Sequence, residues 1–575
     1  MYIKFSLIFL FILSQKSFSQ DNNTLLFKID SVLNEVYNST DLGFSIGIIK
    51  GDSLIYSKGF GYADRENKIK NSEQTIYQIG SITKTFTAAA IGVLEEDNLL
   101  SLNDLAIRHL PQLNFSTKTN NKVITIEDLL SHNTKIIPHD LSWYWFPTSS
   151  DLYLKRIKFM NSNENQGSFN YNNTMYFLLG EIISKASGNS YENFLSKSFF
   201  QPLNMPNTFI KNIKGSKNIA KGYIYRESGF IETKKFDLSL MQAAGGINSN
   251  VMDLSKWLMT WMNDGIFNNQ EILSTNFIKN AISHKNEVME YPFYLPYSDI
   301  YSLSYGLGWT TTSYRGHFSC FLSGNIDGFS SIINFHPKEK IGIIILSNQD
   351  KTNLPECLNR CVSDILFNLP DRNWVNFIKK NYGKTNMVME KKQEILPPVF
   401  NQILGKYQNK AFGTIEISSA NNILYFNAPN ARFKLYHLFD YYFKLIDVDT
   451  DIETEYQLSF IKNFEDEIEK ISINLESSLD EIVFLKESTF NTNDYIGTYA
   501  LGKFNIKISP EKSGDLLIIL PGKPSVKLIP ISALKYKVDG LNGYYVKFII
   551  SNDEKKIIGI KVIEPNRETN FDKIL

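Results

Sequence analysis

Apolar and polar positions follow two different patterns along this chain, and the change comes near residue 370. Before it, longer stretches have apolar residues every three or four positions, which is typical of amphipathic helices. One such helix is predicted after Ser81 and another after Asn173, where Gly188 is a predicted stop. A third helix is predicted from Leu354 to Leu366. The central part of this region is therefore expected to be largely helical.

Short apolar runs at both ends of the same region predict strands. Ile46 to Lys50 and Ser53 to Tyr56 flank Gly51-Asp52, which favours a hairpin. Two late strands are predicted from Ser330 to Phe335 and from Ile341 to Leu346. Strands at both ends with helices between them predict an α/β layered fold in which the terminal segments share one sheet.

The pattern after the polar stretch from Lys379 to Pro398 consists of short strands and turn residues, with little helix. Gly405-Lys406-Tyr407 and Gly497-Thr498-Tyr499 open two similar stretches, and an apolar run follows each of them. This weak repeat favours two small antiparallel β units, each a barrel or a sandwich. One larger β domain with an accidental similarity is the alternative.

The beginning of the chain has the pattern of an export signal. Lys4 precedes an apolar run from Phe5 to Leu13, and Ser17-Phe18-Ser19 suits cleavage near Gln20. An uncleaved N-terminal anchor is the alternative, although the run is shorter than the ~20 residues that span a bilayer as a helix. We therefore expect an exported protein, periplasmic or extracellular, with no integral membrane segment after the signal is removed.

These patterns together predict a division of the 575 residues into five parts. They are a signal peptide (1–20), an α/β domain (21–375), a linker (376–398) and two β accessory units (399–487 and 488–575).

Composition narrows the classes of function. Lys plus Arg and Asp plus Glu both number 60, so the net charge is zero and no basic excess favours nucleic acid as a partner. The three Cys residues are too few, and odd in number, for a disulfide scaffold, and we interpret them as small buried apolar residues. No pattern in the sequence points to a metal or an organic cofactor.

The first candidate chemistry lies at Ser81-Ile82-Thr83-Lys84. A serine hydroxyl needs a base to become a nucleophile, and a lysine serves as that base when burial and a helix N-terminus lower its pKa. The pattern Ser-x-x-Lys recurs at Ser459/Lys462, Ser509/Lys512 and Ser532/Lys535, so alone it means little. Only Ser81 opens an amphipathic helix, where positions three apart share one face and the Ser81 backbone N–H points toward a developing oxyanion.

Two further segments supply candidate partners. Tyr171-Asn172-Asn173 precedes the second long helix, and a tyrosine beside a lysine can exchange a proton with it or act as a phenolate base. Asn173 could hold the lysine and bind a substrate amide or ester. In the segment from Ser323 to Asn325, Gly324 would let a substrate approach the backbone, and the Asn325 N–H would be the second oxyanion donor.

The order of these segments resembles the β-lactamase-related serine hydrolases, which include class C β-lactamases, D-Ala-D-Ala carboxypeptidases and family VIII esterases. Residues 99–104, 109–111, 124–132, 244–246 and 305–309 also resemble family segments in the expected order. The resemblance covers roughly residues 27–350 and implies an α-β-α sandwich with an antiparallel sheet and a helical region. It implies that Ser81, Lys84 and Tyr171 are catalytic, that Asn173, Ser323, Gly324 and Asn325 bind substrate, and that His132 is structural. The β tail resembles accessory modules of some relatives.

The main departure from the family pattern is Leu322. Relatives commonly have Lys or His there, and some esterases have Trp; a cation at that position binds a substrate carboxylate and helps to keep the tyrosine ionised. We therefore expect a hydrolase acting on an ester or a peptide-like amide, with cell-wall peptide a candidate substrate. A binding or sensor protein that has lost turnover is the first alternative, and an unrelated adhesive or carbohydrate-binding surface protein is the second.

Overall fold

The computed structural model describes residues 24–116, 120–161, 169–210, 218–226, 229–234, 237–288, 300–382, 400–451, 453–463, 467–475, 481–487, 492–511, 515–531, 534–551 and 556–574. It divides into two compact units, the first formed by the chain up to Lys391 without Tyr144–Pro147, and the second by Tyr144–Pro147 and Lys392–Leu575. The expected signal peptide lies outside the described residues. Within that part of the chain, no helix has the length and apolar character needed to cross a bilayer.

Unit 1 is built on one antiparallel sheet. Its strands follow the order β11 (Asn286–Glu287), β12 (Ile300–Tyr305), β13 (Thr310–Tyr314), β14 (His317–Ile326), β15 (Phe329–His336), β16 (Ile341–Ser347), β1 (Phe44–Lys50), β2 (Ser53–Phe60). The predicted hairpin is β1 and β2, and β1 also pairs with β16, with Ile46 opposite Ile345. The prediction that the two ends of this region share a sheet is therefore confirmed.

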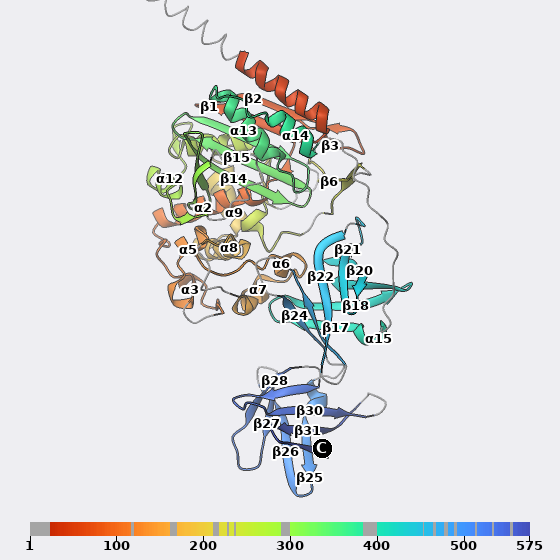
Figure 1. The fold of residues 1–575 in the computed structure, drawn as a ribbon. Coiled ribbons are helices and arrows are strands. Elements are labelled where there is room, and N and C mark those ends of the chain that lie inside the picture. Colours follow the sequence, from red (N-terminus) through yellow and green to blue (C-terminus); the bar gives the residue numbers. More distant parts are fainter. Residues whose placement is uncertain are drawn as a thin grey trace, which may run out of the picture. The chain divides into compact units, whose positions relative to one another are not determined.

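Helices cover both faces of this sheet, as Figure 1 shows, because its central strands are apolar on both faces. Ile343 and Ile345 of β16 pack with the helix over residues 24–40, α13 (Leu354–Leu366) and α14 (Trp374–Tyr382). Ile344 faces the opposite core, which includes side chains of α2 (Thr83–Glu96), α8 (Asn173–Ser187), α9 (Tyr191–Leu195) and α11 (Val251–Met262). The predicted α-β-α sandwich is confirmed.

The remaining elements of unit 1 are short, and most of them lie between the long helices in the sequence. The helices are α3 (Ala106–His109), α4 (Asn120–Val123), α5 (Ile126–Leu130), α6 (Leu141–Tyr144, whose last residue belongs to unit 2), α7 (Ser150–Arg156), α10 (Gln242–Gly245) and α12 (Thr275–Ala281). The strand pairs are β3 (Tyr62–Asp64) with β4 (Ile69–Lys70), β5 (Tyr77–Gln78) with β8 (Asn248–Ser249), β6 (Tyr223–Arg226) with β7 (Gly229–Glu232), and β9 (Ile266–Phe267) with β10 (Gln270–Glu271).

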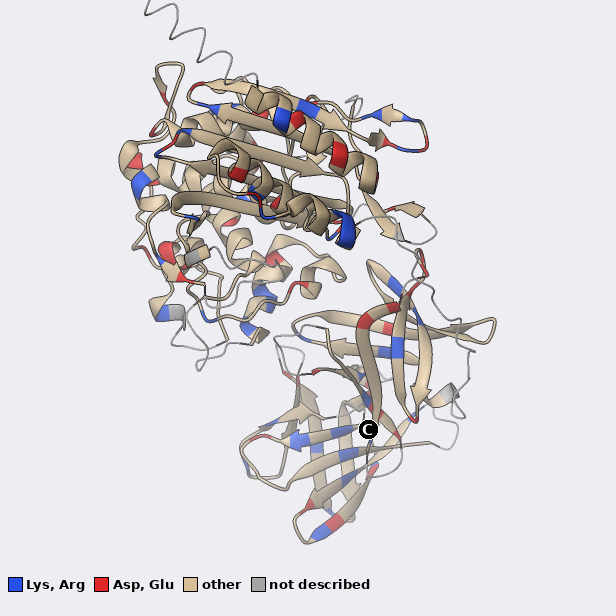
Figure 2. Cartoon of the chain, turned by 45° about the horizontal axis from the view of Figure 1, so that its top comes forward, with Lys and Arg blue, Asp and Glu red and all other residues tan. Residues whose placement is uncertain are grey.

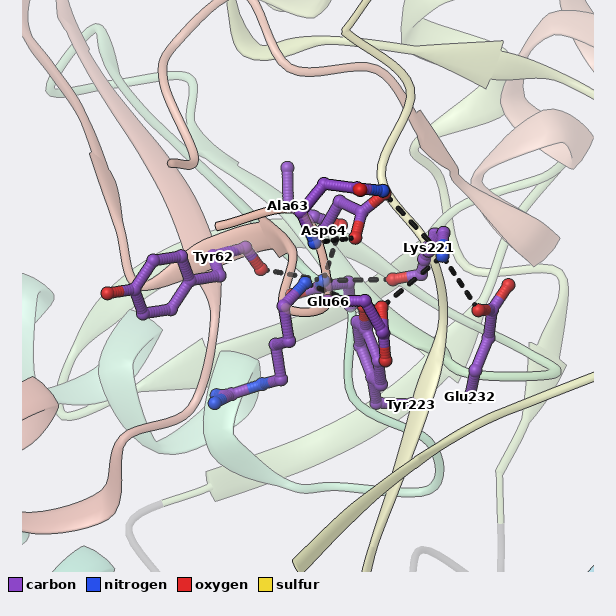
Figure 3. Close-up of polar contacts among 10 residues, drawn as sticks. Tyr62, Ala63, Asp64, Glu66, Lys221, Tyr223 and Glu232 are labelled. Atoms are coloured by element: carbon purple, nitrogen blue, oxygen red, sulfur yellow. Dashed lines mark hydrogen bonds and ion pairs between the residues drawn. The ribbon is translucent and has the colours of Figure 1, made fainter. Parts of the chain in front are cut away.

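A polar cluster ties the β3–β4 loop to β6 and β7, as Figure 3 shows. Lys221 Nζ lies 2.9 Å from Glu232 Oε2 and 3.3 Å from Glu66 Oε2. Tyr223 OH donates to Glu66 Oε2 at 2.7 Å and accepts from the Arg65 backbone N–H at 2.8 Å. Exposed ion pairs add little stability, so the main consequence of this cluster is to fix the course of the two segments.

The expected linker needs a correction at its start. Residues 376–382 belong to α14, and Trp374 and Ile378 of that helix are buried against α13 and the sheet. The charged residues on the exposed face of α14 made it look like a linker in the sequence. Residues 383–398 lie outside the described residues.

Unit 2 contains two closed eight-stranded antiparallel barrels. A one-turn helix, α15 (Phe400–Ile403), precedes the first, and α16 (Thr492–Tyr495) precedes the second. Barrel 1 consists of β17 (Gly405–Asn409), β18 (Gly413–Ala420), β19 (Ile423–Ala428), β20 (Ala431–Phe439), β21 (Tyr442–Asp447), β22 (Glu453–Lys462), β23 (Ile468–Ile473) and β24 (Ile482–Lys486). Barrel 2 consists of β25 (Gly497–Leu501), β26 (Phe504–Pro510), β27 (Leu516–Ile519), β28 (Val526–Pro530), β29 (Lys535–Val538), β30 (Tyr545–Ile550), β31 (Ile557–Glu564) and β32 (Arg567–Lys573).

The weak sequence repeat marks the same structural position in both barrels. Tyr407 and Tyr499 are fully buried, and each hydroxyl donates to the carbonyl four residues earlier, that of Ile403 at 2.8 Å and of Tyr495 at 2.7 Å. Each tyrosine thereby ties the first strand of its barrel to the preceding helical turn. Two separate barrels also exclude the alternative of one larger β domain.

Barrel 1 includes a segment from far away in the sequence. Trp145 and Phe146 belong to unit 2 and are 3% and 1% exposed. The Trp145 ring lies 4.8 Å from that of Phe433 and 5.1 Å from that of Tyr456, and the Asn430 N–H donates to the Trp145 carbonyl at 3.0 Å. Nothing in the local sequence around Trp145 predicts this packing.

Candidate active site

Ser81 lies in a short 3₁₀ turn, Gly80–Ile82, that leads directly into α2. Gly80 has a φ of +53°, a conformation that favours glycine. A Cβ on Gly80 would lie only 3.0 Å from the Asn325 backbone nitrogen. The turn therefore places Ser81 at the beginning of a helix and beside the end of β14.

Lys84 is fully buried and lies one turn from Ser81. Its Nζ is 3.0 Å from Ser81 Oγ, 2.8 Å from Asn173 Oδ1 and 2.9 Å from the Ala244 carbonyl oxygen. Burial lowers the pKa of Lys84 to about 7, although the nearby charge of Asp140 acts in the opposite direction. With a pKa near 7, Lys84 can be neutral at neutral pH, and burial is the cause.

The partners of Lys84 also determine where its lone pair points. Asn173 Oδ1 and the Ala244 carbonyl can only accept hydrogen bonds. A neutral amine has two N–H groups, which these two acceptors use, and one lone pair. That lone pair is left for the hydroxyl of Ser81, so the geometry suits Lys84 as a general base.

Tyr171 lies beside the same amine. Lys84 Nζ is 4.9 Å from the centroid of the Tyr171 ring, and the Tyr171 hydroxyl is hydrogen-bonded to Ser81. Burial raises the pKa of Tyr171 far above its usual value, and the hydrogen bond with Ser81 offsets this only in part. The phenolate considered from the sequence is therefore disfavoured, and Tyr171 is suited to relaying a proton as a neutral phenol.

Asn173 is oriented by its position at the start of α8 and by Asp140. The Asn172 side chain caps this helix by accepting from the Thr174 N–H at 2.9 Å, which is a common way to begin a helix. Asn173 Nδ2 donates to Asp140 Oδ1 at 3.0 Å. Asp140 carries no motif, and the sequence analysis missed it. The expected place of Asn173 beside Lys84 is found.

His132 packs behind Tyr171. It is fully buried with a φ of +58°, and its Nδ1 lies 3.2 Å from the Asn172 backbone nitrogen, which donates to it. The His132 ring centroid lies 4.4 Å from that of Tyr171 and 4.9 Å from that of Tyr305. Burial and the charge of Lys84 hold the pKa of His132 well below its usual value. A neutral imidazole in this position supports the interpretation of His132 as structural.

The wall of the site beside Ser81 is formed by β14. A Cβ on Gly324 would lie 2.0 Å from the Ile79 carbonyl oxygen, so only glycine lets the strand approach this closely. Leu322 is 4% exposed and shares a strand face with Gly324, whereas Ser323 and Asn325 point to the other face. Among the described residues, no hydrogen bond joins the side chain of Ser323 or Asn325 to Ser81, Lys84 or Tyr171.

Figure 2 shows residues of both signs scattered over the elements of each unit. Within the described ranges, no group of three or more His, Cys, Asp or Glu side chains is arranged to hold a metal ion. Cys320, Cys357 and Cys361 are unpaired and buried, as predicted.

Several known proteins are similar to this chain in sequence. A family model described as Beta-lactamase matches residues 38–360, more than half of the chain. Protein flp of Staphylococcus aureus (strain NCTC 8325 / PS 47) is 30% identical over 332 residues, which are 56% of this chain and 63% of that protein. The putative penicillin-binding protein PbpX of Bacillus subtilis (strain 168) is 27% identical over 326 residues, 56% of this chain and 75% of that protein. This chain thus spans less than two thirds of the length of the flp relatives.

A solved structure resembles the chain over a larger share of its length. The octameric penicillin-binding protein homologue from Pyrococcus abyssi superposes with a TM-score of 0.54 at 23% sequence identity, covering 80% of this chain and 99% of that one. At this identity the likeness shows the fold alone.

Proposed function

This chain belongs to the β-lactamase family, and from that premise we propose that it is a serine hydrolase that cleaves an ester or amide bond through an acyl-enzyme on Ser81. The observation that carries the proposal is the fully buried Lys84 amine, 3.0 Å from Ser81 Oγ, with two acceptors on its N–H groups. Among the described residues, Lys84 forms no ion pair, and a buried amine with a lowered pKa is suited to act as a base in catalysis.

In the proposed acylation step, Ser81 Oγ attacks the substrate carbonyl carbon while its proton moves to Lys84 Nζ. The backbone N–H groups of Ser81 and Asn325 hold the negative oxygen of the tetrahedral intermediate. When the intermediate collapses, the bond to the leaving group breaks, and Lys84 returns the proton to the leaving group through Tyr171. The products are the free alcohol or amine and an ester on Ser81.

Deacylation uses the same groups in the reverse direction. Water attacks the ester carbon, and its proton passes to Lys84, directly or through Tyr171. The tetrahedral intermediate then collapses with cleavage of the bond to Ser81 Oγ, which regains a proton from Lys84. The carboxylic acid product leaves, and the neutral amine is restored for the next cycle.

The expected substrate is one that does not depend on a carboxylate at the wall formed by β14. Leu322 is apolar and 4% exposed, so this position supplies no cation. An esterase, or a peptidase of unusual specificity, fits this wall better than a carboxylate-recognising β-lactamase, and β-lactam turnover should be slow. Relatives named penicillin-binding proteins keep cell-wall peptide among the candidates, and we propose export as the location.

The test is covalent labelling followed by intact-mass measurement. The protein is incubated with a fluorophosphonate, an activated ester or a penicillin, alongside Ser81→Ala and, as a matched control, Ser459→Ala. We expect an adduct in the native protein and in Ser459→Ala, and none in Ser81→Ala. If none of the three probes gives an adduct, the proposal is refuted and a binding or sensor protein is favoured. The observation that supports this alternative is the apolar Leu322.

A further inference from the structure

The side-chain amide of Asn173 has two chemically different ends, and only one orientation leaves Lys84 able to act as a base. In the structure Oδ1 faces Lys84 Nζ at 2.8 Å. If the amide were rotated by half a turn, its NH₂ group would face Lys84 instead. An NH₂ group can only donate, so it would take the Lys84 lone pair that Ser81 needs.

Asp140 is the group that decides between the two orientations. Asn173 Nδ2 donates to Asp140 Oδ1 at 3.0 Å. A carboxylate accepts hydrogen bonds and has no hydrogen to give. In the rotated orientation Asn173 Oδ1 would face this carboxylate, two acceptors against each other, which is unfavourable for a partly buried pair.

Asp140 is itself held in place from the other side. The Trp143 indole Nε1 donates to the same Asp140 Oδ1 at 3.0 Å. Asp140 precedes α6, and the Ser142 N–H donates to the His139 carbonyl at 3.0 Å, which closes the turn around Asp140. The carboxylate therefore has a fixed position from which to orient Asn173.

We propose that Asp140 is a positioning residue, which keeps the carbonyl end of the Asn173 amide toward Lys84 and so leaves the Lys84 lone pair to Ser81. The inference rests on the proposed hydrolase function and deepens it. It adds to the site a residue that belongs to no motif and lies 59 positions after Ser81 and 56 after Lys84. Asp140 acts through Asn173 and contacts neither Ser81 nor Lys84 by a hydrogen bond among the described residues.

A second effect of Asp140 gives the inference its own signature. Its negative charge raises the pKa of Lys84, against the larger lowering by burial. Among the described residues, the other titratable groups that face Lys84 are Tyr171 and Tyr176, whose rings lie 4.9 and 5.3 Å from Nζ, and His132 behind them. Burial keeps both tyrosines and His132 neutral near pH 7, whereas the Asp140 carboxylate carries a charge.

The experiment measures the rate of Ser81 acylation by an activated ester from pH 5 to 9 in the native protein, Asp140→Ala and Asp140→Asn. Asp140→Ala frees the Asn173 amide to rotate and should slow acylation on the order of 10- to 100-fold at the optimum pH. Asp140→Asn still offers an oxygen to Asn173 Nδ2 and should restore most of the rate. Both variants lack the charge that raises the pKa of Lys84. The acid limb of the pH–rate profile, where Lys84 becomes protonated, should therefore move to lower pH in both, by up to about one unit.

Asp364→Asn is a matched control. Asp364 also accepts from a tryptophan, Trp374 Nε1 at 3.0 Å, but it lies in α13 on the opposite face of the sheet. Its replacement should lower thermal stability and leave the acid limb in place. If Asp140→Ala does not fold, the acid limb and rate of Asp140→Asn decide alone.

Two results would overturn the inference. The first is that both Asp140 variants are acylated at the native rate and keep the native acid limb. The second is that both lose the same share of the rate and keep the native acid limb, which would mean that Asp140 has only a structural role. A native protein whose Ser81 reacts with no probe would instead refute the proposed function, and the two failures are thus distinguishable.

Discussion

The four-residue pattern Ser-x-x-Lys occurs in both units. The pair in unit 1 and the pair in barrel 1 differ in the distance between serine and lysine and in the burial of the lysine. In unit 1, Ser81 and Lys84 share the first helical turn, and Nζ lies 3.0 Å from Oγ. In barrel 1, Ser459 and Lys462 lie on β22, where a rise of ~3.3 Å per residue puts positions three apart about 10 Å from each other along the strand. Lys462 Nζ instead lies 4.7 Å from the centroid of the Tyr441 ring.

The comparison shows that the motif acquires chemistry from its environment. Lys84 is fully buried beside acceptors of its N–H groups, and burial lowers its pKa to about 7. Lys462 is half-buried on the barrel surface. The same residue types at the same spacing therefore give a candidate base in one unit and a surface lysine in the other.

The largest expected effect comes from removing the base. Lys84→Met should lower the rate of Ser81 acylation about 10³-fold, because Lys84 is the amine hydrogen-bonded to Ser81 and Tyr171, with its raised pKa, is a poor substitute as a base among the described residues. Lys462→Met should leave the rate unchanged. Stopped-flow acylation with an activated ester measures both. Equal rates in Lys84→Met and the native protein would show that Ser81 is activated in another way.

The two units also differ in how their cores are assembled, since barrel 1 includes Trp145 and Phe146 from the middle of the sequence of unit 1. Trp145→Ala should lower the free energy of unfolding of unit 2 by about 3 kcal/mol, because it removes a nearly fully buried indole. Calorimetry of the whole chain would report this as an earlier unfolding transition of unit 2. Phe439→Ala, which removes a ring of the same barrel that is 57% exposed, should have a much smaller effect. Equal effects would show that Trp145 contributes no more than a surface ring.

Burial of Lys84 has a measurable cost in stability that depends on pH. Its pKa falls from 10.5 when unfolded to about 7 when folded, so between these values the unfolded chain holds a proton that the folded chain lacks. The contribution of Lys84 to stability should therefore increase as pH rises from about 7 to about 10, by up to about 1.4 kcal/mol per unit, and reach its minimum below pH 7. Urea unfolding at pH 6, 7.5 and 9 tests this. The free energy of unfolding of the native protein minus that of Lys84→Met should become more positive as pH rises, because the cost of burying Lys84 falls. The same difference for Lys462→Met should stay constant.

The smallest expected effect concerns the wall of the site. Leu322→His should improve cleavage of carboxylate-bearing esters about tenfold relative to neutral ones, because it introduces a charge-assisted hydrogen bond. Leu322→Met is the control, since it changes shape without charge. Specificity constants for a matched pair of esters measure the gain. An unchanged ratio would indicate that position 322 does not contact this part of the substrate.

Most of the fold could be predicted because it depends on local pattern. The predicted hairpin, the helices beginning near Ser81 and Asn173, and the helix from Leu354 to Leu366 are all present. The linker was placed too early, because α14 is short and its last residues, from Lys379 to Tyr382, are mostly polar. Ser81 and Lys84 could be paired from sequence since a single helical turn joins them.

What the sequence determined by itself was therefore the main hairpin and the long helices of unit 1, the pairing of Ser81 with Lys84 and the repeat of two β units, because these depend on residues a few positions apart. Only the tertiary structure decided what surrounds Lys84. Asn173 and Ala244 bind it from 89 and 160 positions away, and Asp140 acts on it through the Asn173 amide and through its charge. Burial and hydrogen-bond direction control the pKa and lone pair of this amine, and both arise from contacts between distant segments. The same holds for Trp145, whose place in barrel 1 follows from packing that no local pattern records.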